Sequence, residues 1–157
     1  MKIKLFAVGK IKRQPYAELA AEYVKRIQKM TSFEILEIPD EAVRAKGEIE
    51  KVLDKEATRI QKSLKPDSYL IVLDEKGTQW SSVDLAWELG QLFQSSSREI
   101  VFLIGGAFGV APSLKSKAKI NLSLSKLTLP HQLARVLTLE QVYRALTILK
   151  NVPYHHE

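Results

Sequence analysis

The chain has 157 residues, 45% of them hydrophobic, which suits one compact domain with a single core. It has no cysteine, which excludes disulfides and thiolate metal sites, and no apolar run approaches the roughly 18 residues of a membrane span. We therefore expect a cytoplasmic protein that forms a single domain over residues 1–157, with no membrane and no metal partner.

The net charge of +6 is unevenly distributed along the chain. Residues 1–13 carry five Lys or Arg and no acidic residue, residues 14–99 carry twelve against sixteen, and residues 100–157 carry seven against two. The three blocks thus hold +5, −4 and +5. This favours a polyanion-binding surface built from the first loop and the last third, although uneven solvated charge is the alternative. The candidate RNA contacts are Lys10, Lys12, Arg13, Lys115, Lys117 and Lys119.

Strand and helix patterns alternate from the start of the chain to its end. The first buried strand runs from Ile3 to Val8 and stops at Gly9, and helical spacing follows from Pro15 to Met30. The later expected elements are a strand over 33–38, a loop over 41–46, a helix over 49–64, a strand over 69–73 ending in a turn at 74–77, a helix capped by Ser81 or Ser82, a strand over 100–104, a short helix within 111–117, a strand over 120–124 and a helix over 131–150. This order predicts an α/β fold with a mainly parallel sheet of about five strands and helices on both faces.

Three glycines follow the fourth expected strand, as Gly105-Gly106-x-x-Gly109. The G-x-G-x-x-G dinucleotide fingerprint and the G-K-[ST] of a phosphate loop are both absent, which disfavours a conventional Rossmann site. Because glycine has no side chain, such a turn permits close backbone approach to a flat group without phosphate, such as adenine. An ordinary tight turn is the alternative interpretation.

The last expected helix is apolar around more than one face. Its apolar residues are Leu133, Ala134, Val136, Leu137, Leu139, Val142, Tyr143, Ala145, Leu146, Ile148 and Leu149. A surface helix needs only one apolar stripe, so we predict a homodimer in which this helix is part of the interface; the alternative is a second covering by another element of this chain. Two arginines of this helix, Arg135 and Arg144, lie nine residues apart and therefore point in opposite directions at about 100° per residue.

Four segments together resemble the RlmH family of SPOUT methyltransferases. They are Phe102-Leu-Ile-Gly-Gly-x-x-Gly, Leu122-Ser-Leu-Ser-Lys-Leu-Thr-Leu-Pro-His-Gln-Leu-x-Arg-Val, Glu140-Gln-Val-Tyr-Arg-Ala and Pro153-Tyr-His. The resemblance covers the whole chain and implies methylation of N3 of a pseudouridine in large-subunit (23S) ribosomal RNA. It also implies a homodimer, a C-terminal trefoil knot and S-adenosylmethionine held by three loops. The corresponding cofactor positions are Leu73, Gly105, Leu124, Ser125, Lys126, Leu127, Thr128 and Leu129.

The resemblance places the reaction at Arg144, Tyr154 and His155. N3 of a uracil-type base carries a proton, so the site must remove that proton and stabilise the imide anion. An arginine can supply the positive field, a histidine can handle the proton, and a tyrosine can stack on or hydrogen-bond a flipped base. The alternatives are a frayed tail and a structural ion pair between Arg144 and Glu140.

Other functions are also compatible with the sequence. A non-catalytic RNA- or ribosome-binding α/β module would account for the basic charge, and an α/β protein could bind an unrelated small ligand. Neither gives a reason for Arg144, Tyr154 and His155 to accompany a glycine-lined pocket. Within the enzyme class, a different RNA nucleotide could be the target.

Overall fold

The computed structural model describes residues 2–43, 47–95 and 99–156, so residues 44–46 of the expected loop at 41–46 lie outside the described part. Within these ranges the strands are β1 (Lys2–Val8), β2 (Ser32–Ile38), β3 (Tyr69–Gln79), β4 (Ile100–Ile104) and β5 (Ile120–Ser123). The helices are α1 (Gln14–Gln28), α2 (Ile49–Ser63), α3 (Ser82–Ser95), α4 (Pro112–Lys115) and α5 (His131–Leu149). None of the helices in the described ranges is long and apolar enough to cross a membrane.

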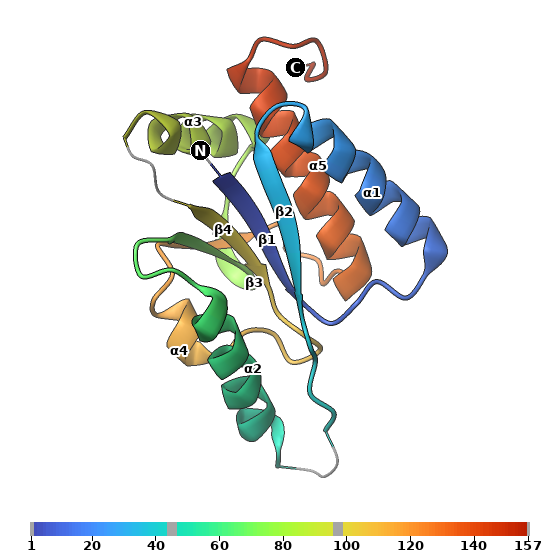
Figure 1. The fold of residues 1–157 in the computed structure, drawn as a ribbon, viewed down its shortest axis with the longest axis vertical. Coiled ribbons are helices and arrows are strands. Elements are labelled where there is room, and N and C mark those ends of the chain that lie inside the picture. The colour runs from blue at the N-terminus through green and yellow to red at the C-terminus, as the bar shows by residue number, and fades with distance from the viewer. Residues whose placement is uncertain (1, 44–46, 96–98, 157) are drawn as a thin grey trace.

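The strands form one parallel sheet in the order β2-β1-β4-β3-β5, which confirms the predicted α/β class. Helices α1, α3 and α5 cover one face, while α2 and α4 cover the other (Figure 1). Strand alternation explains the two cores, because Ile3, Leu5 and Ala7 face the first helix layer and Phe6 and Val8 face the second. All strands being parallel, their carboxyl ends meet at one edge of the sheet.

The prediction that the strand ends in a turn at residues 74–77 is wrong, because β3 resumes its pairing after these residues and continues to Gln79. Leu73 and Thr78 both pair with Leu122 of β5, so the four residues between them bulge out and β3 then continues. Gly77 belongs to this bulge, and a Cβ on it would lie 2.5 Å from the carbonyl oxygen of Asn121. Pairing with β5, a contact distant in sequence, thus overrides the local turn signal.

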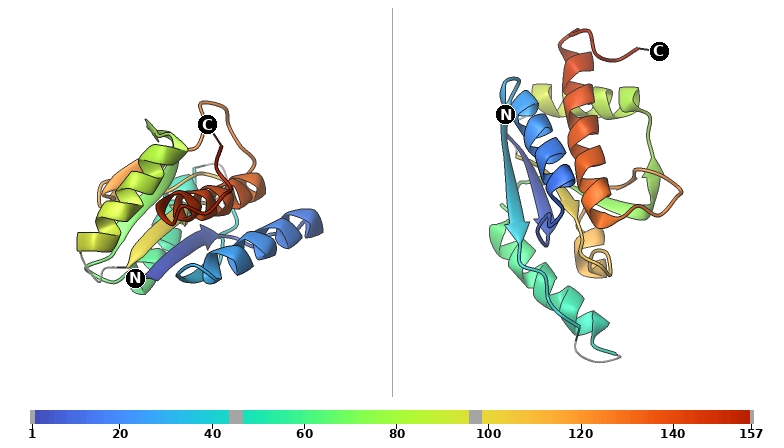
Figure 2. Two further views of the ribbon diagram at one scale, coloured as in Figure 1. Left: turned by 90° about the horizontal axis from the view of Figure 1, so that it is seen from above. Right: turned by 90° about the vertical axis from the view of Figure 1, so that its right-hand side faces the viewer.

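Helix α5 lies between α1 and α3 on its face of the sheet (Figure 2). Every residue from His131 to Leu149 is buried or half-buried within this chain. Gly90 of α3 allows the close approach, since a Cβ there would lie 2.9 Å from a methyl group of Leu149. The burial of α5 therefore gives no argument for a partner subunit, and its place in a dimer interface stays a prediction. The second covering comes from the same chain.

Candidate functional site

A cavity of about 560 Å³ opens at the carboxyl ends of β3, β4 and β5, the edge at which open α/β sheets bind ligands. Its walls are the bulge of β3, the glycine turn after β4, the loop after β5 and the first turn of α5. Seven of the eight predicted cofactor residues line it: Leu73, Gly105, Leu124, Ser125, Leu127, Thr128 and Leu129. Lys126 does not belong to the lining. The structure therefore brings the three predicted loops together.

The glycine turn is both a tight turn and a wall of this cavity. It is closed by a hydrogen bond from the Gly109 N–H to the Gly106 carbonyl at 3.1 Å. A Cβ on Gly105 would overlap the carbonyl of Gly109 and lie 2.8 Å from a methyl group of Val110. Only glycine fits at this position, so backbone rather than a side chain faces the cavity.

The charged side chains in the cavity wall balance one another. Lys115, one of the predicted RNA contacts, lines the cavity but forms an ion pair with Asp74 at 2.7 Å. Burial alone would raise the pKa of Asp74, but the hydrogen bonds from Lys115 and from the Lys76 backbone, together with the charges of both lysines, lower that pKa. Asp74 and Glu75 are matched in the lining by Lys115 and Lys76, so the cavity wall carries two charges of each sign.

The first basic group lies beside this edge of the sheet. Lys10, Lys12 and Arg13 follow the carboxyl end of β1, and all three are exposed. The backbone N–H groups of Lys12 and Arg13 donate to the Oε1 atom of Gln132 on α5, at 2.9 and 3.0 Å. The loop is therefore ordered by its backbone while its cationic side chains remain available to a polyanion.

The second basic group lies elsewhere. Lys117 and Lys119 are exposed, but the Lys119 N–H donates to the carbonyl of Leu70, near the amino ends of β3 and β5. Strands β1 and β5 are also three positions apart in the sheet, roughly 14 Å at the usual spacing between strands. The structure does not join the predicted RNA contacts into one patch, and their role stays a prediction.

The C-terminal tail folds back onto α5 and is not frayed. Asn151 adopts a left-handed φ of 51°, and the Val152 N–H donates to the carbonyl of Thr147 at 2.9 Å. This is the Schellman arrangement that ends many helices, here with asparagine at the position where glycine is common. It reverses the chain, so that Tyr154 and His155 are half-buried against the helix.

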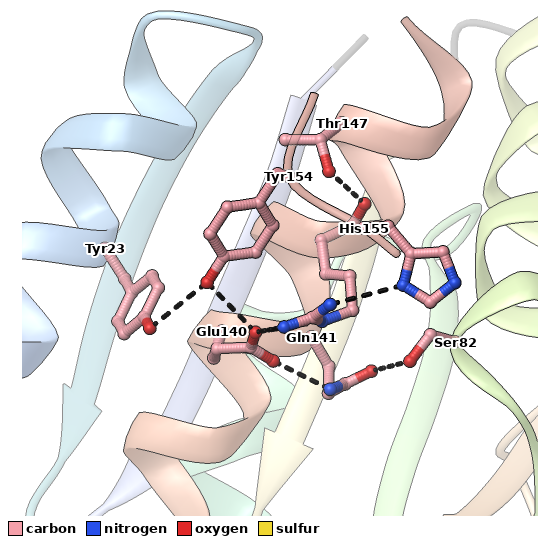
Figure 3. A network of polar contacts seen from close by, with 8 residues as sticks. Tyr23, Ser82, Glu140, Gln141, Thr147, Tyr154 and His155 are labelled. Carbon is pink, nitrogen blue, oxygen red and sulfur yellow. Dashed lines mark hydrogen bonds and ion pairs between the residues drawn. The ribbon is translucent and has the colours of Figure 1, made fainter. Parts of the chain in front are cut away.

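The three predicted catalytic residues, Arg144, Tyr154 and His155, form one cluster with Glu140, which we call the tail cluster (Figure 3). The Glu140 carboxylate accepts from Arg144 Nε at 2.9 Å and from the Tyr154 hydroxyl at 3.1 Å. Arg144 lies 3.2 Å from His155 Nδ1 and stacks over the Tyr154 ring at 4.8 Å. The Tyr23 hydroxyl, on α1, reaches that of Tyr154 at 3.4 Å. The ion pair between Glu140 and Arg144 therefore exists, but it is part of a larger arrangement.

The surroundings fix the protonation of two members of the tail cluster. The hydrogen bond with Glu140 raises the pKa of Arg144, which keeps its positive charge. Burial, followed by the contacts with Tyr23 and Glu140, raises the pKa of Tyr154 far above its ordinary value. Tyr154 is therefore a neutral phenol at physiological pH and not a base. Of the three predicted catalytic residues, this leaves His155 to take a proton.

The cavity and the tail cluster lie at opposite ends of α5. His131 lines the cavity, and Arg144 follows thirteen residues later, roughly 20 Å along the helix. One chain therefore does not bring its predicted catalytic residues to its own predicted cofactor residues. Sequence reasoning also missed Tyr23 and the contacts of Gln132, because long-range partners leave no local pattern.

The sequence matches known proteins over nearly its whole length. A family model described as "Predicted SPOUT methyltransferase" matches residues 1–155. A relative from Desulforamulus reducens is 42% identical over 158 residues, which covers 99% of both chains. Another from Caldicellulosiruptor saccharolyticus is 44% identical over 153 residues, 98% of this chain and 99% of its own. Both relatives are named ribosomal RNA large subunit methyltransferase H.

Solved structures with little sequence identity share the fold. A probable methylase family protein from Haemophilus influenzae has a TM-score of 0.57 at 12% identity, over 99% of this chain and 70% of its own. A Legionella pneumophila protein, solved in complex with the bound cofactor SAM, has a TM-score of 0.50 at 15% identity, over 92% of this chain and 66% of its own. At these identities the likeness concerns the fold alone.

Proposed function

This chain belongs to the SPOUT methyltransferase family, and from that premise we propose that it is a single-domain, cytoplasmic enzyme that methylates large-subunit ribosomal RNA with S-adenosylmethionine. We further propose N3 of a pseudouridine as the methyl acceptor. The observation that carries the proposal is the tail cluster, in which Arg144, Tyr154 and His155 meet beside a helix whose other end lines a nucleoside-sized cavity. A non-catalytic RNA-binding module would have no use for that combination.

S-adenosylmethionine supplies an electrophilic methyl group carried on a cationic sulfonium. The glycine turn at Gly105 exposes backbone groups for an adenosine, and Leu73 and the 124–129 loop offer apolar surface and hydroxyl groups. Glu75 is the carboxylate in the lining that we propose to face the sulfonium, since Asp74 is paired with Lys115 at 2.7 Å. These residues support the proposal that the cavity holds the cofactor.

The tail cluster supports the chemistry at N3. As N3 gains the methyl group its proton leaves, and we propose that His155, rather than the neutral phenol of Tyr154, takes it on Nδ1. That atom accepts from Arg144 at 3.2 Å until the guanidinium turns to the base. Arg144 stabilises the negative charge that develops on the imide oxygens. Glu140 holds the guanidinium through two hydrogen bonds, at 2.9 and 2.6 Å, so that the charge is already oriented when the base arrives. Because the Tyr154 ring already lies against Arg144 at 4.8 Å, we propose that it holds this guanidinium, while stacking on the base stays a prediction.

We propose that the working enzyme is a homodimer. Because roughly 20 Å of helix separates the cavity from the tail cluster, a two-fold partner is needed to bring the tail of one chain to the cavity of the other. Two apolar side chains beside the cavity support this. Leu127 is 76% exposed and Phe108 is 45% exposed, as expected for residues that a partner subunit covers.

Mixing two inactive chains should restore activity if the active site is shared. A chain with Arg144→Ala keeps a sound cavity, and a chain with Gly105→Val keeps a sound tail cluster. With random pairing half of the dimers are mixed and each has one complete site, so about a quarter of the parental sites should work. Transfer of labelled methyl groups to ribosomal RNA measures this. Mixed dimers identified by mass but without activity would contradict a shared site.

The loop of Lys10, Lys12 and Arg13 is expected to bind RNA phosphate. Replacing all three residues with Ala should flatten the dependence of RNA affinity on salt, because fewer phosphates are then neutralised by the protein. The slope should fall by roughly 0.7 to 0.9 log units, per log unit of salt, for each phosphate that the variant no longer neutralises. Titration of a ribosomal RNA fragment at several salt concentrations measures the slope.

A variant matched in charge controls for the change in net charge. Lys29, Lys51 and Lys62 are exposed on or beside other helices, and replacing them with Ala removes three charges from different surfaces. Their replacement should alter the slope much less. If both triple variants keep the parental slope, the 10–13 loop does not contact RNA.

A further inference from the structure

The loop of Lys10, Lys12 and Arg13, which we call the basic loop, is held in position by one side chain of α5. β1 ends at Val8, so the backbone beyond Gly9 has left the sheet. The Oε1 atom of Gln132 accepts hydrogen bonds from two successive backbone groups, the N–H of Lys12 and the N–H of Arg13. Because both cationic side chains are exposed, the direction in which they project follows from this backbone anchor.

The neighbouring residue, His131, holds the glycine turn in a similar way. Its ring and Gly105 both line the cavity, and the nearby Gly105 backbone favours the protonated ring, against the larger effects of burial and Arg135 on its pKa. Its Nε2 atom lies 3.3 Å from a guanidinium nitrogen of Arg135. Since a guanidinium only donates, Nε2 accepts and the ring proton sits on Nδ1. Burial, and then the charge of Arg135, lowers the pKa of His131, so the ring is neutral at physiological pH.

Arg135 ties this helical turn to the sheet. Its side chain is 1% exposed, and it donates to the Glu37 carboxylate of β2 at 2.7 Å and to the carbonyl of Gly9 at 2.8 Å. A buried charge held by a carboxylate and a carbonyl tolerates little displacement, because moving it would break charge-assisted bonds. The first turn of α5 therefore has a fixed position relative to the carboxyl ends of β1 and β2.

We propose that the first turn of α5 is a shared anchor for both substrates, in which His131 positions the glycine turn for the cofactor and Gln132 positions the basic loop for RNA. This inference rests on the proposed function. Both are positioning residues, since each acts through the backbone of another segment. Arg135 fixes the helical turn that carries His131 and Gln132, so the distance and orientation between the cavity and the basic loop stay constant.

The test compares isosteric variants with conservative ones. Gln132→Met removes the hydrogen-bond acceptor, whereas Gln132→Glu keeps an oxygen atom at that position. In the same way, His131→Leu removes the N–H donor of the ring, whereas His131→Asn keeps an N–H donor. Losing two backbone hydrogen bonds should weaken RNA binding by Gln132→Met about tenfold and raise KM for RNA, with little change in KM for S-adenosylmethionine. His131→Leu should show the opposite selectivity. Each conservative variant should recover most of the loss.

Direct binding separates this inference from the proposed function. Calorimetry with S-adenosylmethionine and anisotropy with a ribosomal RNA fragment are measured on the full chain, with Gln28→Met as the control for the Gln to Met change. If the parental chain binds neither ligand, the proposed function fails. If the parental chain binds both ligands, two results would show that the shared anchor is wrong. In the first, Gln132→Met and His131→Leu bind both ligands like the parent. In the second, each of these variants weakens the binding of both ligands equally.

Discussion

A chain that ends at Pro153 is expected to bind S-adenosylmethionine normally and to transfer no measurable methyl group to RNA. The truncation removes Tyr154 and His155, and with them the proton acceptor and the ring under Arg144. Loss of a general base alone typically costs about 10²- to 10⁴-fold in rate. The residues that line the cavity all lie between Leu73 and Ala134, so the truncation removes none of them, and cofactor affinity measured by calorimetry should stay close to that of the parent. The rate is measured with labelled cofactor and ribosomal RNA.

Two point variants divide the effect of the truncation. Arg144→Ala should slow transfer by roughly 10²- to 10³-fold, the usual cost of losing one preorganised donor to a developing anion. Arg144→Lys keeps the charge but loses the planar fork, so its rate should fall between those of Ala and the parent. Full turnover by the truncated chain would show that the tail carries no chemistry. A parental rate in Arg144→Ala would remove the electrostatic role.

Replacing Gly105 with Val is expected to remove cofactor binding. The new Cβ would overlap backbone of Gly109, and the hydrogen bond between Gly106 and Gly109 keeps the turn from opening. Inserting atoms into packed structure costs about 1 to 3 kcal/mol of folding stability, so the turn has to shift, and its backbone then no longer lies where the ligand would contact it. Calorimetry with S-adenosylmethionine measures the change in affinity.

The neighbouring Ala107 provides the control for the glycine variant. Its side chain is exposed in the same turn and also lines the cavity, so Ala107→Val replaces a methyl with an isopropyl group at the cavity wall where a Cβ is already present. We expect that variant to lose much less cofactor affinity than Gly105→Val and to melt at nearly the parental temperature. A Gly105→Val chain that binds as tightly as the parent would exclude this cavity as the cofactor site.

The sequence predicts features that depend on local periodicity. The last helix is expected over residues 131–150 and is observed at His131–Leu149. The parallel sheet follows from alternating strands and helices, and three loops meet at one edge because parallel strands all end there. Arg135 and Arg144 do point in opposite directions, one buried against the sheet and one into the tail cluster. The trefoil knot stays a prediction from the resemblance, since it leaves no periodic signal.

Features that depend on distant partners could not be predicted. The bulge of β3 exists because β5, more than forty residues later, pairs on both sides of it. Lys119 and Lys12 are both basic, but only the strand order shows that they lie at different places on the sheet. The anchor at Gln132 joins atoms 120 and 119 residues apart in sequence. A change in any of these contacts would leave the local propensities unaltered.

The strand order also sets a delay during synthesis. β1 pairs with β2 on one side and with β4 on the other, and β4 ends at Ile104, 96 residues after Val8. At about 5 to 20 residues per second, the nascent chain waits roughly 5 to 20 seconds for that second neighbour. Throughout this time one edge of β1 has unpaired backbone groups beside the apolar side chains of Ile3, Leu5 and Phe6, a surface prone to pair with other chains. We expect ribosome-bound chains that stop before residue 100 to bind a chaperone that covers this edge. Chains that continue past Leu149 should no longer bind that chaperone.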